Sequence, residues 1–211
     1  MEKIFAVGDI HGHLNKLLPL LDKIEIDSER DTLVFIGDYI DRGPSSFEVV
    51  EYLIDLKMHL ENIVFLKGNH EDMLEKYLAG TDRLSYLANG GQKTLEQYLK
   101  RSQGHGTYPI PPEHLNFLES LFLFYQTDDY IFVHAGLKKK VPLEMQNPTD
   151  LLWIRNDFIS SDYDFGKRVI FGHTPFSEPL VQSNKIGIDT GAVYGNKLTC
   201  VELPELVFHY A

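Results

Sequence analysis

Five short apolar runs in this chain are each followed, within three residues, by a glycine and by an aspartate, asparagine or histidine. Each run has the length of a strand and is rich in β-branched or aromatic residues, which favours buried β-structure. The runs are Ile4–Val7, Leu33–Ile36, Ile63–Leu66, Ile131–Val133 and Val169–Phe171. An ordinary turn needs glycine and one polar residue, so this repeated placement of acids, amides and imidazoles at strand ends constrains the fold strongly.

The motifs at these strand ends have the composition of a metal site. In chain order they are GDIHG (8–12), GDYIDRG (37–43), GNHE (68–71), HAG (134–136) and GHT (172–174). In α/β sheets, ligands bind at the carboxyl ends of the strands, and glycine lets ions approach the backbone closely. Carboxylate, amide oxygen and imidazole together suit divalent Mn, Fe, Co or Zn. A single motif could equally be a turn or a helix N-cap, but five in succession favour two ions that share an aspartate.

Helical periodicity lies between the early runs. Leucines at 14, 17, 18 and 21 predict a helix that Pro19 should disturb unless it lies near the start of the helix, and further helices are predicted over 44–54 and 73–78. Strands that alternate with helices predict an α/β domain. Residues 81–101 and 111–124 are predicted to be helical, with a Gly- and Pro-rich loop at 102–112. The segments after about residue 165 predict antiparallel hairpins.

Composition excludes several classes of function. The net charge of −11 argues against a nucleic-acid partner, which normally requires a basic face. The sequence has no uninterrupted apolar run of 18 residues, so no membrane span and no membrane partner are expected. The single cysteine, Cys200, excludes a thiolate zinc finger, and with the absence of a signal-peptide pattern it favours the cytoplasm.

Taken in order, the motifs GDxHG, GDxxDRG, GNHE, HAG and GHT resemble those of the phosphoprotein phosphatase family of calcineurin-like metallophosphoesterases. Segments 89–98 (NGGQKTLEQY), 152–155 (LWIR) and 188–195 (IDTGAVYG) are most similar to small bacterial and phage-type serine/threonine protein phosphatases. The resemblance implies that residues 1–211 form a single catalytic domain. It also implies an αββα sandwich, in which two mixed β-sheets are flanked by helices and the metals lie at one edge.

The resemblance assigns metal ligands to residues that match the motifs. The first ion would be bound by Asp9, His11 and Asp38. The second ion would share Asp38 as a bridge and would also be bound by Asn69, His134 and His173. We expect two divalent ions per chain, with manganese preferred and iron, zinc or cobalt as alternatives.

Four other residues would carry out the chemistry. The resemblance implies that His70 is the general acid and that Asp41 orients it. Arg42 and Arg155 would bind the phosphate oxygens, because the guanidinium fork matches them bidentately. A hydroxide that bridges the metals would attack phosphorus directly, without a covalent phosphoenzyme.

Three functions remain open at this point. The reading preferred from the sequence is a phosphomonoesterase that acts on phosphoserine and phosphothreonine in proteins, with phosphotyrosine as a further substrate. The alternative is hydrolysis of dinucleotide polyphosphates such as diadenosine tetraphosphate, since relatives with nearly the same site cleave phosphoanhydrides. A non-catalytic binding module would be indicated by loss of a ligand or of His70, and neither is lost.

A dinucleotide hydrolase should offer additional basic residues for the phosphates and an aromatic side chain for the base. Near the motifs, the basic candidates are Lys67 and Lys138–Lys140, and the aromatic candidates are Tyr39, Tyr108 and Tyr194. The net negative charge of the chain disfavours a polyanionic dinucleotide. The segments at 89–98 and 152–155 resemble those of protein phosphatases and therefore favour the phosphopeptide.

Overall fold

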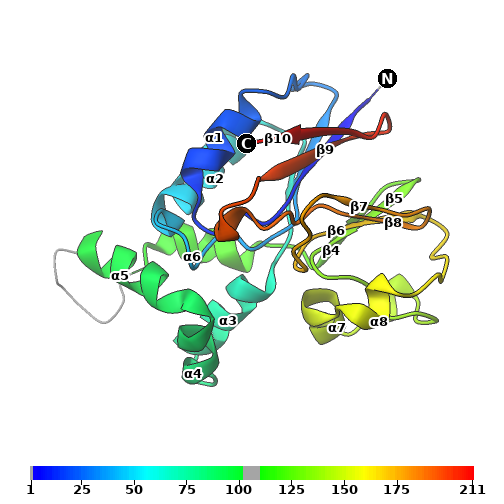
Figure 1. Ribbon diagram of the computed structural model, residues 1–211. Coiled ribbons are helices and arrows are strands. Elements are labelled where there is room, and N and C mark those ends of the chain that lie inside the picture. The colour runs from blue at the N-terminus through cyan, green and yellow to red at the C-terminus, as the bar shows by residue number, and fades with distance from the viewer. Residues whose placement is uncertain (1, 102–109) are drawn as a thin grey trace.

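The computed structural model describes residues 2–101 and 110–211, whose strands form two five-stranded sheets (Figure 1). The first sheet has the order β10 (Val207–Tyr210), β9 (Thr199–Leu203), β1 (Ile4–Val7), β2 (Thr32–Phe35), β3 (Ile63–Phe65). The second has the order β4 (Phe124–Gln126), β5 (Tyr130–Val133), β6 (Arg168–Phe171), β8 (Lys185–Gly187), β7 (Leu180–Val181). Both sheets are mixed: β1, β2 and β3 are parallel, as are β5, β6 and β8, while the remaining pairs are antiparallel.

Helices cover the outer face of each sheet. The helices beside the first sheet are α1 (Leu14–Leu21), α2 (Ser46–His59), α3 (Asn69–Leu78), α5 (Gln92–Arg101) and α6 (Pro112–Glu119). Those beside the second sheet are α7 (Pro148–Trp153) and α8 (Asn156–Ile159). Shorter elements are α4 (Arg83–Tyr86), the π-helical η1 (Leu87–Gly91), and the 3-10 turns η2 (Leu143–Met145) and η3 (Ala192–Tyr194).

A buried apolar layer joins the two sheets. Ala6, Val34 and Ile36 from the first sheet pack with Phe132 and Ile170 from the second. Separate apolar clusters lie between each sheet and its helices. The layers therefore run helix, sheet, sheet, helix, which confirms the sandwich expected from the family resemblance.

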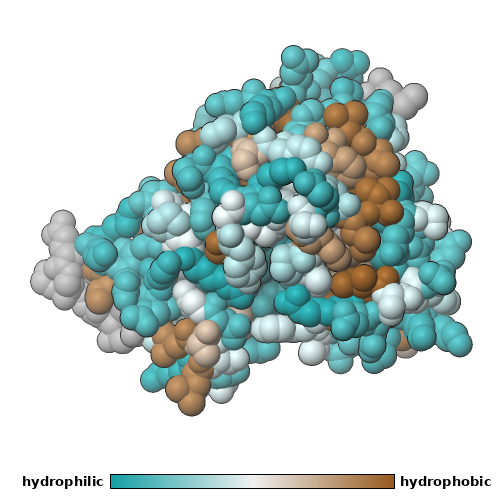
Figure 2. All heavy atoms as spheres, in the orientation of Figure 1, coloured by the Kyte–Doolittle hydropathy of each residue, from teal (hydrophilic) through white to brown (hydrophobic). Residues whose placement is uncertain are grey.

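The surface seen from the same side is mostly hydrophilic (Figure 2). Apolar side chains form a band on the right of this view and a smaller group at the lower left, where Figure 1 places α4; Leu84 of that helix is 81% exposed. No helix among the described residues has both the length and the apolar character needed to cross a membrane.

The five predicted strands form, but three expectations about their neighbours need correction. Helix α1 contains Pro19 and continues to Leu21. The predicted helix over 111–124 ends at Glu119, and β4 follows it. Strand β6 pairs in parallel with β5 and β8, because its apolar run is buried at the centre of the sheet, whereas β7 with β8 and β9 with β10 are antiparallel as predicted. Most of the loop predicted at 102–112, with Tyr108, lies outside the described residues.

Strand register places the motif loops at one edge. Val7, Phe35 and Phe65 are cross-strand partners at the ends of β1, β2 and β3. Because these strands are parallel, the loops that follow them leave the sheet side by side. In the second sheet, the Gly172 amide donates a hydrogen bond to the His134 carbonyl (2.8 Å), which holds the last two motifs together.

Candidate active site

The motif loops have an unusual backbone. Seven non-glycine residues among those described have a positive φ, and five of them lie in the motifs. These five are His11 (46°), Asp38 (53°), Asp41 (73°), Arg42 (65°) and His173 (63°). A left-handed conformation costs about 1–2 kcal/mol for such residues. Strain of this kind clusters at functional sites, where the surrounding structure maintains it.

Two motif glycines make room for carboxylates. A Cβ atom on Gly68 would lie 2.1 Å from Asp38 Oδ1, and one on Gly172 would lie 2.2 Å from Asp9 Oδ1. No larger residue fits either position without displacing the acid. The glycines therefore let two aspartates lie directly against neighbouring backbone.

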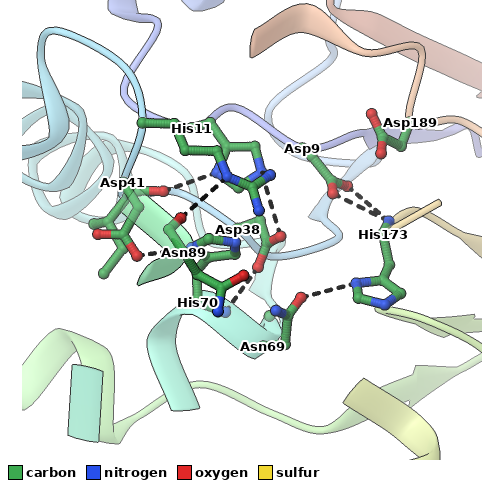
Figure 3. A network of polar contacts seen from close by, with 12 residues as sticks. Asp9, His11, Asp38, Asp41, Asn69, His70, Asn89, His173 and Asp189 are labelled. Carbon is green, nitrogen blue, oxygen red and sulfur yellow. Dashed lines mark hydrogen bonds and ion pairs between the residues drawn. The ribbon is translucent and has the colours of Figure 1, made fainter. Parts of the chain in front are cut away.

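His11 and Asp38 form one half of the centre (Figure 3). His11 Nδ1 donates to the Ile40 carbonyl (2.9 Å), so the lone pair of Nε2 faces Asp38 Oδ2 at 3.4 Å. Burial lowers the pKa of His11 to about 3, which keeps the ring neutral. A neutral imidazole nitrogen and a carboxylate are both acceptors, and a cation between them satisfies both.

His134, Asn69 and His173 form the other half. His134 Nδ1 donates to the Ile36 carbonyl (3.1 Å), and its Nε2 lies 2.9 Å from Asn69 Oδ1 and 3.5 Å from Asp38 Oδ1. His173 Nδ1 lies 2.8 Å from the same amide oxygen, and its Nε2 is buried without a hydrogen-bond partner among the described residues. Burial lowers the pKa of His134 and takes that of His173 to about 2. Hydrogen-bond acceptors therefore outnumber donors in this half of the centre as well, which is expected of a site that binds a cation.

Asp38 links the two halves. Potential ligand atoms of His11, Asp38 and His70 lie within 4.8 Å of one another, and so do those of Asp38, His134 and His173. Burial opposes ionisation of Asp38, but the surrounding imidazoles, His134 foremost, hold its pKa below the usual range. The residues present therefore fit two divalent ions that share this carboxylate, but the first group contains His70 and not the predicted ligand Asp9.

Asp9 lies beside this cluster together with an acid that the sequence analysis did not identify. Asp9 accepts hydrogen bonds from the His173 amide (3.0 and 3.2 Å), and burial, then the charge of Asp189, raises its pKa well above the usual range. Asp189 is buried, accepts from the Gly191 amide (2.9 Å), and has a pKa raised by burial to about 6. Asp189 follows β8 and precedes Gly191 by two residues, so the same strand-end rule could have found it.

His70 and Asp41 are paired as the family resemblance implied. His70 Nδ1 lies 2.7 Å from Asp41 Oδ2, and both residues are buried. The other oxygen of Asp41 accepts from the Tyr86 hydroxyl (2.8 Å) and from Thr94 Oγ1 (2.7 Å). Burial opposes protonation of His70, but Asp38 and Asp41 together raise its pKa above the ordinary value. The pairing with Asp41 therefore favours the protonated form of the ring.

Glu71 holds two motif loops together. Its fully buried carboxylate accepts from the amides of Asp38 (3.0 Å), Tyr39 (2.9 Å) and Gly68 (2.9 Å). These bonds fix the GDY turn against the start of α3, which carries Asn69 and His70. The GNHE motif drew attention to Glu71, but its role becomes evident only from these contacts across 33 residues of sequence.

The two predicted phosphate-binding arginines lie on either flank of the cluster. Arg42 Nη1 lies 3.3 Å from His11 Nε2, while Arg42 Nε donates to the Asn89 carbonyl (3.2 Å). Arg155 is exposed, and its Nη1 donates to the His173 carbonyl (3.1 Å) and to Thr174 Oγ1 (3.3 Å). Each arginine therefore lies against a proposed metal ligand, Arg42 against His11 and Arg155 against His173.

The lysine and tyrosine candidates for binding a dinucleotide differ in burial and in their contacts. Tyr39 is fully buried and donates to the Leu66 carbonyl (2.6 Å), so it cannot contact a base. Lys67 is paired with Glu75 (2.6 Å), and Lys138–Lys140 are exposed. Tyr194 is 66% exposed, and its hydroxyl accepts from Arg42 Nη1 (3.2 Å). Tyr194 is therefore the one described tyrosine candidate beside the site.

This fold and its paired cation-binding halves define a metal-dependent phosphoesterase. The chain matches the calcineurin-like phosphoesterase family over residues 2–202, and it belongs to that family of hydrolases. Among curated proteins it is similar to the asymmetrical bis(5'-nucleosyl)-tetraphosphatases PrpE of Bacillus thuringiensis (strain Al Hakam) and Bacillus cereus (strain 03BB102). Identity to each is 28%, over 97% of this chain and 92% of the relative.

Solved structures show the same fold. A candidate diadenosine tetraphosphatase superposes with a TM-score of 0.77 at 24% identity, covering 100% of this chain and 93% of that one. A serine/threonine phosphatase from Saccharomyces cerevisiae with similarity to human PP5 superposes with a TM-score of 0.65 at 18% identity, covering 96% and 72%. The architecture is thus shared by proteins whose named substrates differ.

Proposed function

We propose that this protein hydrolyses dinucleoside polyphosphates and cleaves one phosphoanhydride bond of a bis(5'-nucleosyl) tetraphosphate. The observation that carries the proposal is the 28% identity to asymmetrical tetraphosphatases along nearly the whole length of both chains. This is the alternative from the sequence analysis, and it displaces the phosphoprotein reading preferred there.

The segments that favoured a protein phosphatase have roles common to both reactions. Within 89–98, the carbonyls of Asn89 and Gly90 accept from Arg42 (3.2 and 3.3 Å). The LWIR segment supplies Arg155 itself. Both segments therefore build the phosphate clamp, which a phosphopeptide and a dinucleotide need equally, so neither distinguishes the two substrates.

The six predicted ligands would hold two divalent ions; oxygen and imidazole donors without thiolate suit manganese, iron, cobalt or zinc, and of these we propose manganese. Bound divalent ions supply the acidity that ionises water near neutral pH and offset the charge of the phosphates. The ligands in this proposal are Asp9, His11, Asp38, Asn69, His134 and His173.

The side chains perform the remaining steps. Arg42 and Arg155 hold the non-bridging oxygens of the attacked phosphate, each through its guanidinium fork. A bond forms between water oxygen and phosphorus, while the anhydride P–O bond breaks and leaves its electrons on the departing nucleotide. His70, oriented by Asp41, gives a proton to that oxygen. Asymmetrical cleavage yields a nucleoside triphosphate and a nucleoside monophosphate.

The proposal includes the organisation of the chain. Residues 1–211 would act as one catalytic domain, because the site draws on both sheets and on loops from Asp9 to His173. The buried free thiol of Cys200 is compatible with a cytoplasmic protein.

The test compares kcat/KM for diadenosine tetraphosphate and for phosphoserine peptides at the same Mn²⁺ concentration and pH. We expect the dinucleotide to exceed the best phosphopeptide by tenfold or more, with the triphosphate and monophosphate as equimolar products on ion-exchange chromatography. A higher kcat/KM for the phosphopeptide would contradict the proposal and restore the protein phosphatase reading.

A further inference from the structure

Tyr194 occupies an unusual position at the rim of the site. Its side chain is 66% exposed, although its hydroxyl accepts a hydrogen bond from Arg42 Nη1 (3.2 Å). The same guanidinium nitrogen lies 3.3 Å from Nε2 of His11, a proposed metal ligand. The Arg42 side chain therefore connects Tyr194 to the proposed metal site. Among the described residues, no other aromatic ring packs against it. An aromatic face is therefore available to a ligand beside the phosphate clamp.

The loop that carries Tyr194 is held in place on several sides. The turn η3 is flanked by Gly191 (φ 72°) and Gly195 (φ 92°), both in the left-handed region. Asp189 Oδ1 accepts from the Gly191 amide (2.9 Å), and Lys16 Nζ donates to the carbonyls of Ala192 (3.1 Å) and Asn196. The exposed ring thus stands on a fixed loop, which reduces the entropy lost when a ligand binds.

We propose that Tyr194 is a nucleobase-binding residue, on which one base of the substrate stacks while Arg42 holds the adjacent phosphate. This inference rests on the proposed function, and it extends that function by assigning a subsite for the base. The Arg42 Cζ atom lies 6.0 Å from the centroid of the Tyr194 ring. A nucleotide separates its phosphate from its base by a single ribose, so adjacent arginine and aromatic groups match its two ends.

Stacking on an aromatic side chain accepts every base, because each has a π-face. The interaction would thus add affinity for nucleotides without selecting adenine over guanine. It would also explain how an acidic chain with few basic residues binds a dinucleotide. Stacking of the base supplies binding energy that ion pairs with the phosphates do not.

The test measures binding calorimetrically, so that it does not depend on turnover. The probes are AMP and ribose 5-phosphate, which share sugar and phosphate and differ only in the base. The proteins, all loaded with Mn²⁺, are wild type, Tyr194→Phe, Tyr194→Leu and the control Tyr163→Leu. Tyr163 is also a partly exposed tyrosine (38%), but it precedes β6 and so lies at the opposite end of that strand from His173.

We expect wild type to bind AMP about 5- to 150-fold more tightly than ribose 5-phosphate, the range typical of base stacking. Tyr194→Phe, which keeps the ring, and Tyr163→Leu should retain this ratio. Tyr194→Leu should reduce it to within about twofold of unity by weakening AMP alone.

Equal weakening of both probes in Tyr194→Leu would overturn the inference, because it would mean that Tyr194 acts only through Arg42. An unchanged ratio in that variant would overturn it as well. Failure of the proposed function gives a different result: wild type would show the base-dependent ratio but would not cleave diadenosine tetraphosphate.

Discussion

Replacement of Gly90 by alanine tests how Arg42 is positioned. Gly90 lies in η1 with a φ of 100°, and its carbonyl accepts from the Arg42 amide (3.3 Å). A Cβ atom there would lie 2.8 Å from Arg42 Cγ, whereas ordinary van der Waals contacts begin at 3.4 Å. The arginine must therefore move by about 0.6 Å or more, and the Arg42–Asn89 hydrogen bond moves with it.

The two effects of this substitution can be given magnitudes. A side chain in the left-handed region costs about 1–2 kcal/mol of stability. A misplacement of about 1 Å at a group that orients substrate can cost about 10²-fold in rate. We expect Gly90→Ala to lower kcat/KM by about 10- to 100-fold and to weaken inhibition by inorganic phosphate, without release of metal, because no proposed ligand is moved.

The matched control is Gly166→Ala. Gly166 has a φ of 79°, and a Cβ atom on it would meet nothing within 4 Å. It should lose a comparable amount of thermal stability and keep its kcat/KM within about twofold. If Gly90→Ala retained full activity and full phosphate inhibition, the conclusion that the 89–91 segment positions Arg42 would be wrong.

Two further predictions concern proton binding. His70→Asn should lower kcat by about 10²–10⁴ on an alkyl phosphate and by less on a dinucleoside tetraphosphate, whose phosphate leaving group needs less protonation; equal losses on both substrates would contradict its role as general acid. Burial raises the pKa of Glu71 to about 8, from about 4 when exposed, whereas the histidines whose pKa burial lowers are largely neutral in both states above about pH 7, so between pH 7 and 8 the folded metal-free protein binds more protons than the unfolded chain. Its Tm should therefore fall as pH rises from 7 to 8, and less steeply in Glu71→Gln; a constant or rising Tm would contradict this.

Sequence reasoning located much of the site because the responsible signals are local. The apolar runs before Asp9, Asp38 and Asn69 are strands, and parallel strands necessarily bring their ends together. The alternation of strands and helices indicated an α/β domain, but the division into two packed sheets came from the family resemblance. Periodicity along one segment does not specify which sheet a strand joins, as β6 illustrates.

The missed features depend on contacts between residues distant in sequence. Glu71 accepts from amides on another loop, and Tyr86 and Thr94 donate to Asp41 from 45 and 53 residues away. No periodic pattern encodes such contacts. The positive φ of Asp38 and Arg42 is equally unpredictable from propensity, since tertiary contacts impose it against the local preference.

The central claim is that Asp38 joins two cation sites, and anomalous diffraction from crystals grown with Mn²⁺ tests it most directly. The account predicts two manganese peaks about 3.5–4 Å apart, with the Asp38 carboxylate between them, His11 on one side, and Asn69, His134 and His173 on the other. A single peak, or two peaks of which only one contacts Asp38, would contradict it.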